Sequence, residues 1–214
     1  MRVQSVNVAQ PRSVLYRGKT VATGIFKEPT DGRVAVRRLS LDGDVQVDRR
    51  YHGGLDKAVY AYPLEHYPAW AAVVGRELLP GQFGENLTTQ GLLEVEVCLA
   101  DVYRFGTALL EVTMPRTPCF KLGIKMDDAT FPKKFLATGN LGIYFRVLEE
   151  GEVGAGDAIE FMQRDASPVT LRSLWNLCYV DEGNESLAES ILNRYPLLGG
   201  EWRNPLEERI SASR

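Results

Sequence analysis

The pattern of hydrophobic and polar positions divides the chain near residue 165. Before that point, short runs rich in β-branched and aromatic residues alternate with glycine turns such as Asp31-Gly32 and Gly154-Ala155-Gly156-Asp157. Runs of this kind, bounded by turn residues, predict β-strands. The predicted strands cover residues 3–8, 19–27, 34–39, 95–99, 103–105, 108–113, 143–148 and 158–162. Many short strands closed by glycine turns indicate a barrel or a sandwich.

Two helices are expected to interrupt these strands. Residues 63–74 carry apolar side chains at helical spacing, and Pro63 suits the first turn of a helix. We interpret His66 and Trp70 within this segment as structural, since a tryptophan at helical spacing is usually part of the core. Residues 127–138 form a second, weaker helical pattern.

After residue 165 the hydrophobic spacing becomes helical. It predicts helices over residues 168–177, 185–194 and 199–213, and the proline at position 205 indicates that the last helix starts near residue 204. Three short amphipathic helices are marginally stable alone. We therefore predict a β-rich domain over residues 1–165 and a three-helix domain over residues 166–214 that packs on it.

Composition and charge narrow the classes of function. The 214 residues carry a formal net charge of −3, which argues against a general nucleic-acid-binding protein. No apolar run approaches the roughly 20 residues that a membrane-spanning helix needs, so we expect no membrane partner. The three cysteines are far apart and form no disulfide framework, and this usage fits a cytoplasmic protein best.

Several common catalytic patterns are absent from the sequence. With two histidines the chain cannot form a three-histidine zinc site, and it contains no HExxH motif. No serine lies in a GxSxG nucleophile elbow, and no glycine-rich segment has the order required for a phosphate loop or a dinucleotide fingerprint.

The strongest chemical signal is the segment from Met114 to Lys121. Its single cysteine, Cys119, follows two prolines that restrict the backbone, and it lies between Arg116 and Lys121. Positive charge near a sulfur favours the thiolate, which is the form that binds a soft metal or acts as a nucleophile. A buried structural cysteine is the alternative interpretation of the same segment.

Two further polar clusters interrupt the apolar sequence. Residues 44–59 contain His52 followed by two glycines and Lys57, and residues 80–89 contain Asn86 and Thr88. Histidine can donate, accept or ligate, and an asparagine amide can read the edge of a heterocycle. Each cluster alone is also compatible with an ordinary turn.

Taken together and in order, these clusters resemble the MOSC family, the domain found at the C-terminus of molybdenum-cofactor sulfurases, and within it the YiiM-type branch. The motifs extend over nearly the whole first domain. They comprise Gly43, Asp44, Gln46, His52, Gly53, Gly54, Asp56, Lys57, Ala58, Val59, His66, Tyr67, Trp70, Phe83, Gly84, Glu85, Asn86, Leu87, Pro115, Arg116, Pro118, Cys119, Lys121, Leu122, Gly139, Gly142, Tyr144, Arg146, Val147, Leu148, Gly156 and Asp157.

This resemblance implies a mainly β fold, an antiparallel β-barrel with a cleft, followed by a small C-terminal three-helix unit. It also implies a molybdenum cofactor, with Cys119 as the metal-ligating and catalytic residue. Candidate contacts to the cofactor are His52, Lys57, Asn86, Thr88, Arg116 and Lys121.

The activity that the resemblance implies is reduction of N-hydroxylated small molecules, such as 6-hydroxylaminopurine-like bases. The chain has no flavin, haem or iron–sulfur motif, so we expect a separate electron-donor protein. One alternative is a carrier that holds a persulfide on Cys119, or delivers molybdopterin, without turnover. Another is an interaction domain that has lost the cofactor.

Overall fold

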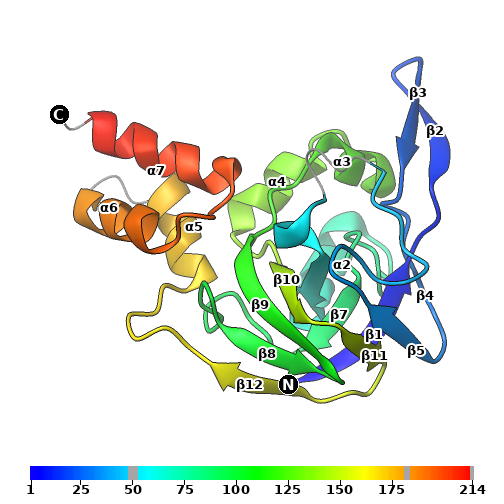
Figure 1. The fold of residues 1–214 in the computed structure, drawn as a ribbon. Helices are drawn as coiled ribbons and strands as arrows, with labels where there is room; N and C mark the ends of the chain where they lie inside the picture. Colours follow the sequence, from blue (N-terminus) through cyan, green and yellow to red (C-terminus); the bar gives the residue numbers. More distant parts are fainter. Residues whose placement is uncertain (48–52, 181–183, 213–214) are drawn as a thin grey trace.

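The computed structural model describes residues 1–47, 53–180 and 184–212. It contains a β-rich body, with the three C-terminal helices at one side and a β-hairpin projecting at the other (Figure 1). The mainly β character with added helices is confirmed. None of the helices in the described ranges combines the length and apolar character needed to cross a membrane.

The body is built on an eight-stranded mixed sheet. Its strand order is β12-β8-β9-β10-β6-β7-β1-β4. The strands are β1 (Arg2–Val8), β4 (Glu28–Pro29), β6 (Val59–Pro63), β7 (Leu87–Gln90), β8 (Val102–Phe105), β9 (Ala108–Pro115), β10 (Ile143–Glu149) and β12 (Ile159–Gln163). Two separate pairs accompany it: β2 (Arg12–Tyr16) with β3 (Lys19–Thr23), and β5 (Arg33–Val36) with β11 (Gly151–Gly154).

The predicted antiparallel barrel is not confirmed. Among the described residues the sheet remains open between β12 and β4. An isolated bridge between Arg2 and Ala158, with backbone hydrogen bonds on either side of it, links the start of β1 to the approach to β12. Strands β6 and β7 pair in parallel. Parallel neighbours need a crossover connection, and here η2 (Leu64–His66) and α2 (Tyr67–Val74) provide it.

An aromatic cluster joins this crossover to the sheet. Trp70 of α2 lies 4.8 Å from Phe131 and 5.6 Å from Phe135, both on α4 (Phe131–Thr138), measured between ring centroids. Tyr62 of β6 lies 4.4 Å from Phe83. The predicted structural role of Trp70 is therefore confirmed. His66 also has a structural partner, since its Nε2 lies 2.8 Å from the buried Glu94 carboxylate.

The structure differs from the sequence-based expectations in several places. Residues 95–99 form turns and an isolated bridge rather than a strand, because the Cys98 amide donates to the nearby Asp101 side chain. Helix α3 (Phe120–Met126), which follows Cys119, was not expected. The last helix, α7 (Gly200–Ala212), agrees with the predicted range 199–213, and only the later start near residue 204 that Pro205 indicated is wrong.

The C-terminal helices contact the body through two buried or half-buried tryptophans. Helices α5 (Leu171–Tyr179) and α6 (Glu185–Arg194) are capped by the side chains of Thr170 and Asn184. Trp175 of α5 donates from Nε1 to the Leu136 carbonyl at 2.9 Å, and the fully buried Trp202 of α7 donates to the Pro115 carbonyl at 2.8 Å. The division at residues 165 and 166 stays a prediction.

Candidate functional site

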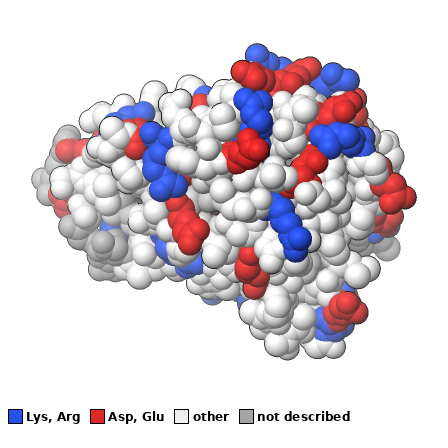
Figure 2. Space-filling view, turned by 90° about the horizontal axis from the view of Figure 1, so that it is seen from below, with Lys and Arg blue, Asp and Glu red and all other residues white. Residues whose placement is uncertain are grey.

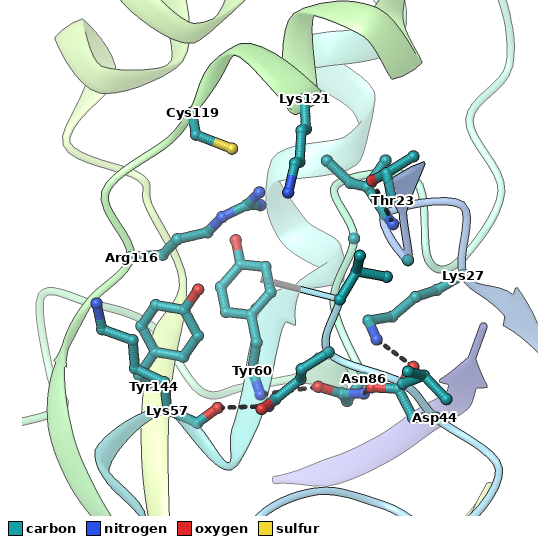
Figure 3. A pocket seen from close by; sticks show the side chains of 16 residues that line it. Thr23, Lys27, Asp44, Lys57, Tyr60, Asn86, Arg116, Cys119, Lys121 and Tyr144 are labelled. Atoms are coloured by element: carbon teal, nitrogen blue, oxygen red, sulfur yellow. Dashed lines mark hydrogen bonds and ion pairs between the residues drawn. The ribbon is translucent and has the colours of Figure 1, made fainter. Parts of the chain in front are cut away.

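A pocket of about 590 Å³, part of it open to solvent, lies where the Cys119 segment faces the ends of β3 and β6. Arg116 and Cys119 reach it from the segment that joins β9 to α3 (Phe120–Met126), and Lys121 reaches it from the first turn of α3 (Figure 3). Tyr60 and Tyr144 come from β6 and β10.

Cys119 is held at a change of backbone direction. The preceding β9 ends at Pro115, and Cys119 is the extended residue just before the first turn of α3. Its thiol is free and only partly buried, and it lines the pocket. The next residue, Phe120, stacks on Tyr16 of the projecting hairpin at 5.7 Å between ring centroids. The alternative of a sulfur enclosed by hydrocarbon is therefore wrong.

Arg116 lies buried beside Cys119 with its guanidinium 4.7 Å from the centre of the Tyr60 ring. Its Nη1 donates to the Phe83 carbonyl. Burial opposes its positive charge, but Tyr60, Tyr144 and Cys119 together raise the pKa of Arg116. Burial also raises the pKa of Tyr144 to about 12, so this phenol stays protonated at neutral pH.

The opposite wall contains a buried ion pair. Lys27 donates to Asp44, and their side chains are 9% and 1% exposed. Burial lowers the pKa of Lys27, although the Asp44 carboxylate acts in the other direction. Asp44 also accepts from the Ala9 amide at 3.0 Å and from Asn86 Nδ2 at 2.9 Å. These contacts fix the loop after Leu41 against β1.

Both ends of the Asn86 side-chain amide form hydrogen bonds within this wall. In addition to its bond to Asp44, its Oδ1 accepts from the Tyr60 amide at 3.2 Å. Thr88 is fully buried outside the pocket lining, where its hydroxyl accepts from Asn7 and donates to Glu85. The expected contact of Thr88 with a cofactor therefore has no support from its position.

Cations outnumber carboxylates in the pocket wall. The described lining carries Lys27, Lys57, Arg116 and Lys121 but only one carboxylate, Asp44. This contrasts with the surface in Figure 2, where the described part shows basic and acidic residues interspersed. The excess of positive charge favours an anionic ligand.

Five of the predicted residues meet at this pocket: Lys57, Asn86, Arg116, Cys119 and Lys121. Segments distant in the sequence supply them, so their convergence is a property of the fold. Thr88 does not join them, and the prediction for His52 falls outside the described residues. Their roles toward a cofactor stay predictions.

Sequence reasoning did not assign a site role to Lys27, Tyr60 or Tyr144. Lys27 ends a β-rich run, and Tyr60 lies in an apolar run, so neither carries a local signal of function. Tyr144 was quoted among the family motifs, which was the one available indication. Glu201, which pairs with Lys57 from helix α7, had no signal at all.

Comparison with known proteins identifies the family. The MOSC domain matches residues 48–160, which include half of the residues that line the pocket. The chain belongs to the MOSC domain family. It is 41% identical over 201 residues to the uncharacterized protein YflK of Bacillus subtilis, covering 94% of this chain and 90% of YflK. It is 34% identical over 181 residues to YiiM of Escherichia coli, covering 78% of this chain and 80% of YiiM.

The structural comparison supports the YiiM-type branch of the MOSC family. The crystal structure of YiiM from Geobacillus stearothermophilus aligns with a TM-score of 0.80 and 35% identity, covering 98% of both chains. The MOSC chain is also 36% identical over 151 residues to a protein named reductase from Gibberella moniliformis. That match covers 69% of this chain but only 27% of the fungal protein.

Proposed function

We propose that this MOSC protein is a molybdenum-cofactor-dependent reductase of N-hydroxylated compounds, such as 6-hydroxylaminopurine-like bases. The observation that carries the proposal is the part-exposed Cys119 thiol in a pocket whose wall has an excess of cations. The fungal relative named reductase and the similarity to YiiM support an oxidoreductase role. We propose a separate electron-donor protein and a cytoplasmic location on the sequence arguments above.

The residues present fit such a cofactor. A thiolate is a soft ligand, suited to a metal already bound by the sulfurs of a pterin, and Cys119 is the cysteine that the pocket offers. In the described ranges no three His, Cys, Asp or Glu side chains are grouped to hold a metal ion, so a metal bound by Cys119 would need further ligands, such as those of a cofactor. Arg116 and Lys121 would hold the anionic phosphate of the pterin.

The protein residues have distinct tasks in this proposal. When bound, the cofactor would supply the two electrons that, together with two protons, convert an N-hydroxyl compound to an amine and water. Cys119 would anchor the metal end, while Arg116, which its neighbours keep charged, would position the anionic end. The Tyr144 hydroxyl, which stays protonated at neutral pH, can hold a proton for the substrate oxygen.

Metal analysis of protein from a host that makes the cofactor tests this proposal directly. We expect the wild-type chain to retain molybdenum and pterin, and Cys119→Ala to lose the metal and the reductase activity while keeping its fold. Cys178→Ala is the matched control, because Cys178 lies in α5 against the Trp202 carbonyl and away from the pocket. Retention of molybdenum with full activity in Cys119→Ala contradicts the proposal.

The accessibility of Cys119 also favours a second candidate, a sulfur carrier that holds a persulfide on this residue. Mass analysis after incubation with a sulfur donor separates the two. A stable adduct of one sulfur atom on Cys119, together with no reductase activity in the metal-loaded protein, identifies the carrier.

A further inference from the structure

The cations of the pocket differ in their counter-charges. Lys27 is paired with the buried Asp44, and Lys57 is paired with Glu201. Arg116, in contrast, forms no ion pair with a carboxylate anywhere in the described part of the chain, and its Nη1 donates to the neutral carbonyl of Phe83. The positive charge available to a ligand is therefore uneven across the pocket.

Glu201 reaches Lys57 from the far end of the sequence. The two residues are 144 positions apart, and their side chains are 26% and 16% exposed. The turn that carries Glu201 is fixed by its neighbour, the fully buried Trp202, which donates to the Pro115 carbonyl at 2.8 Å. Helix α7 thus holds a carboxylate against one wall of the pocket at a defined place.

The paired Lys57 ammonium lies 5.8 Å from the centre of the Tyr144 ring. Glu201 offsets the positive charge of the lysine, and the Tyr144 ring lies beside this ion pair. An anionic group entering here would have to compete with Glu201 for the ammonium, whereas an uncharged planar group would meet the Tyr144 ring without that competition.

We propose that Glu201 is a specificity-determining residue: by neutralising Lys57 it reserves the Lys57 and Tyr144 side of the pocket for an uncharged part of a ligand and leaves anion binding to the Arg116 side. This inference rests on the proposed function and deepens it. In that reaction, Arg116 would hold the anionic cofactor phosphate, and the Tyr144 ring would receive the neutral N-hydroxylated substrate.

Alkylation of Cys119 measures the charge balance without any cofactor. Iodoacetate is an anion and iodoacetamide is neutral, so the ratio of their rates reports how strongly the pocket attracts an anion to the sulfur. Dividing the two rates cancels changes in thiol accessibility and ionisation. Peptide mass analysis assigns the label, since Cys98 is buried and burial raises the pKa of Cys178 to about 12.

The four combinations of charge give distinct expectations. Glu201→Gln should raise the ratio of iodoacetate to iodoacetamide rates by on the order of threefold at low salt, since one negative charge beside the pocket is removed. Lys57→Gln should lower it by a similar factor, and the double variant should return to the wild-type value. Glu201→Asp keeps the charge and should keep the ratio.

Glu207→Gln is the matched control, because Glu207 is on the same helix but is exposed and paired with Arg203. A ratio that is unchanged in both Glu201→Gln and Lys57→Gln, in variants whose circular dichroism matches the wild type, overturns the inference. Lys57→Gln probes the pair from the other side, so the test does not depend on Glu201→Gln folding. A chain that shows the expected ratios but retains no molybdenum would refute the proposed function and leave the charge balance standing.

Discussion

The buried pair of Lys27 and Asp44 gives a prediction whose size follows from the structure. Replacing Lys27 by methionine keeps most of the aliphatic chain but leaves the Asp44 carboxylate, 1% exposed, without its counter-charge. Removing one member of a buried pair typically costs 3–5 kcal/mol. Asp44 keeps two donors, the Ala9 amide and Asn86, so we expect a loss near the lower end, about 3 kcal/mol.

Urea unfolding followed by tryptophan fluorescence measures this loss at neutral pH. For a chain of this length, about 3 kcal/mol also corresponds to a fall in melting temperature of roughly 6 to 12 °C. The double variant Lys27→Met/Asp44→Asn removes both charges and keeps an oxygen that can accept from the Ala9 amide. It should recover to within about 1 to 2 kcal/mol of the wild type.

Two results would refute this reasoning. The first is a free energy of unfolding for Lys27→Met that lies within about 1 kcal/mol of the wild-type value, which is the size of one ordinary hydrogen bond. In that case the pair is not a buried element of the pocket wall. If the double variant is as unstable as Lys27→Met, the loss comes from packing of the lysine chain rather than from the unpaired carboxylate.

Two further predictions concern other contacts around the pocket. Trp202→Phe leaves the Pro115 carbonyl without its donor, so it should cost about 1–3 kcal/mol in the free energy of unfolding and speed alkylation of Cys119 by iodoacetamide. Trp175→Phe, the same change made at α5, should leave that rate unaltered. Burial lowers the pKa of Lys125 from 10.5 to about 8, so the unfolded chain binds more protons and stability should rise with pH between these values. Chemical denaturation should show this rise as about 2 kcal/mol between pH 7.5 and 9.5 for the wild type relative to Lys125→Met, and equal slopes would contradict it.

Much of the secondary structure was predictable because it has a local cause. The helix over residues 185–194 was predicted with the bounds that α6 has, since its apolar stripe and the Asn184 cap are encoded within a few residues. Strands β1, β9 and β10 also lie within a few residues of their predicted ranges. The failures were segments such as 95–99, where a side chain offers the backbone an alternative partner.

The parallel pairing of β6 with β7 was not predictable in the same way. Each strand is short and mostly buried, so its pattern does not show which neighbour it takes or in which direction. The open sheet follows from such pairings. The barrel was predicted from the family resemblance and not from the pairing of individual strands. The start of α7 at Gly200 also depends on a long-range contact, the hydrogen bond from Trp202 to the Pro115 carbonyl.

The sequence by itself determined which residue types are available at the Cys119 segment, because prolines, cations and the cysteine are neighbours along the chain. It also contained enough of the family's motif residues to place the chain in the MOSC family. Only the tertiary structure decided which cations face that sulfur and which are neutralised, as Lys27 is by Asp44 and Lys57 by Glu201. The partners in these two ion pairs are 17 and 144 positions apart in the sequence. Such pairs leave no local sequence pattern, since side chains so far apart along the chain meet only through folding.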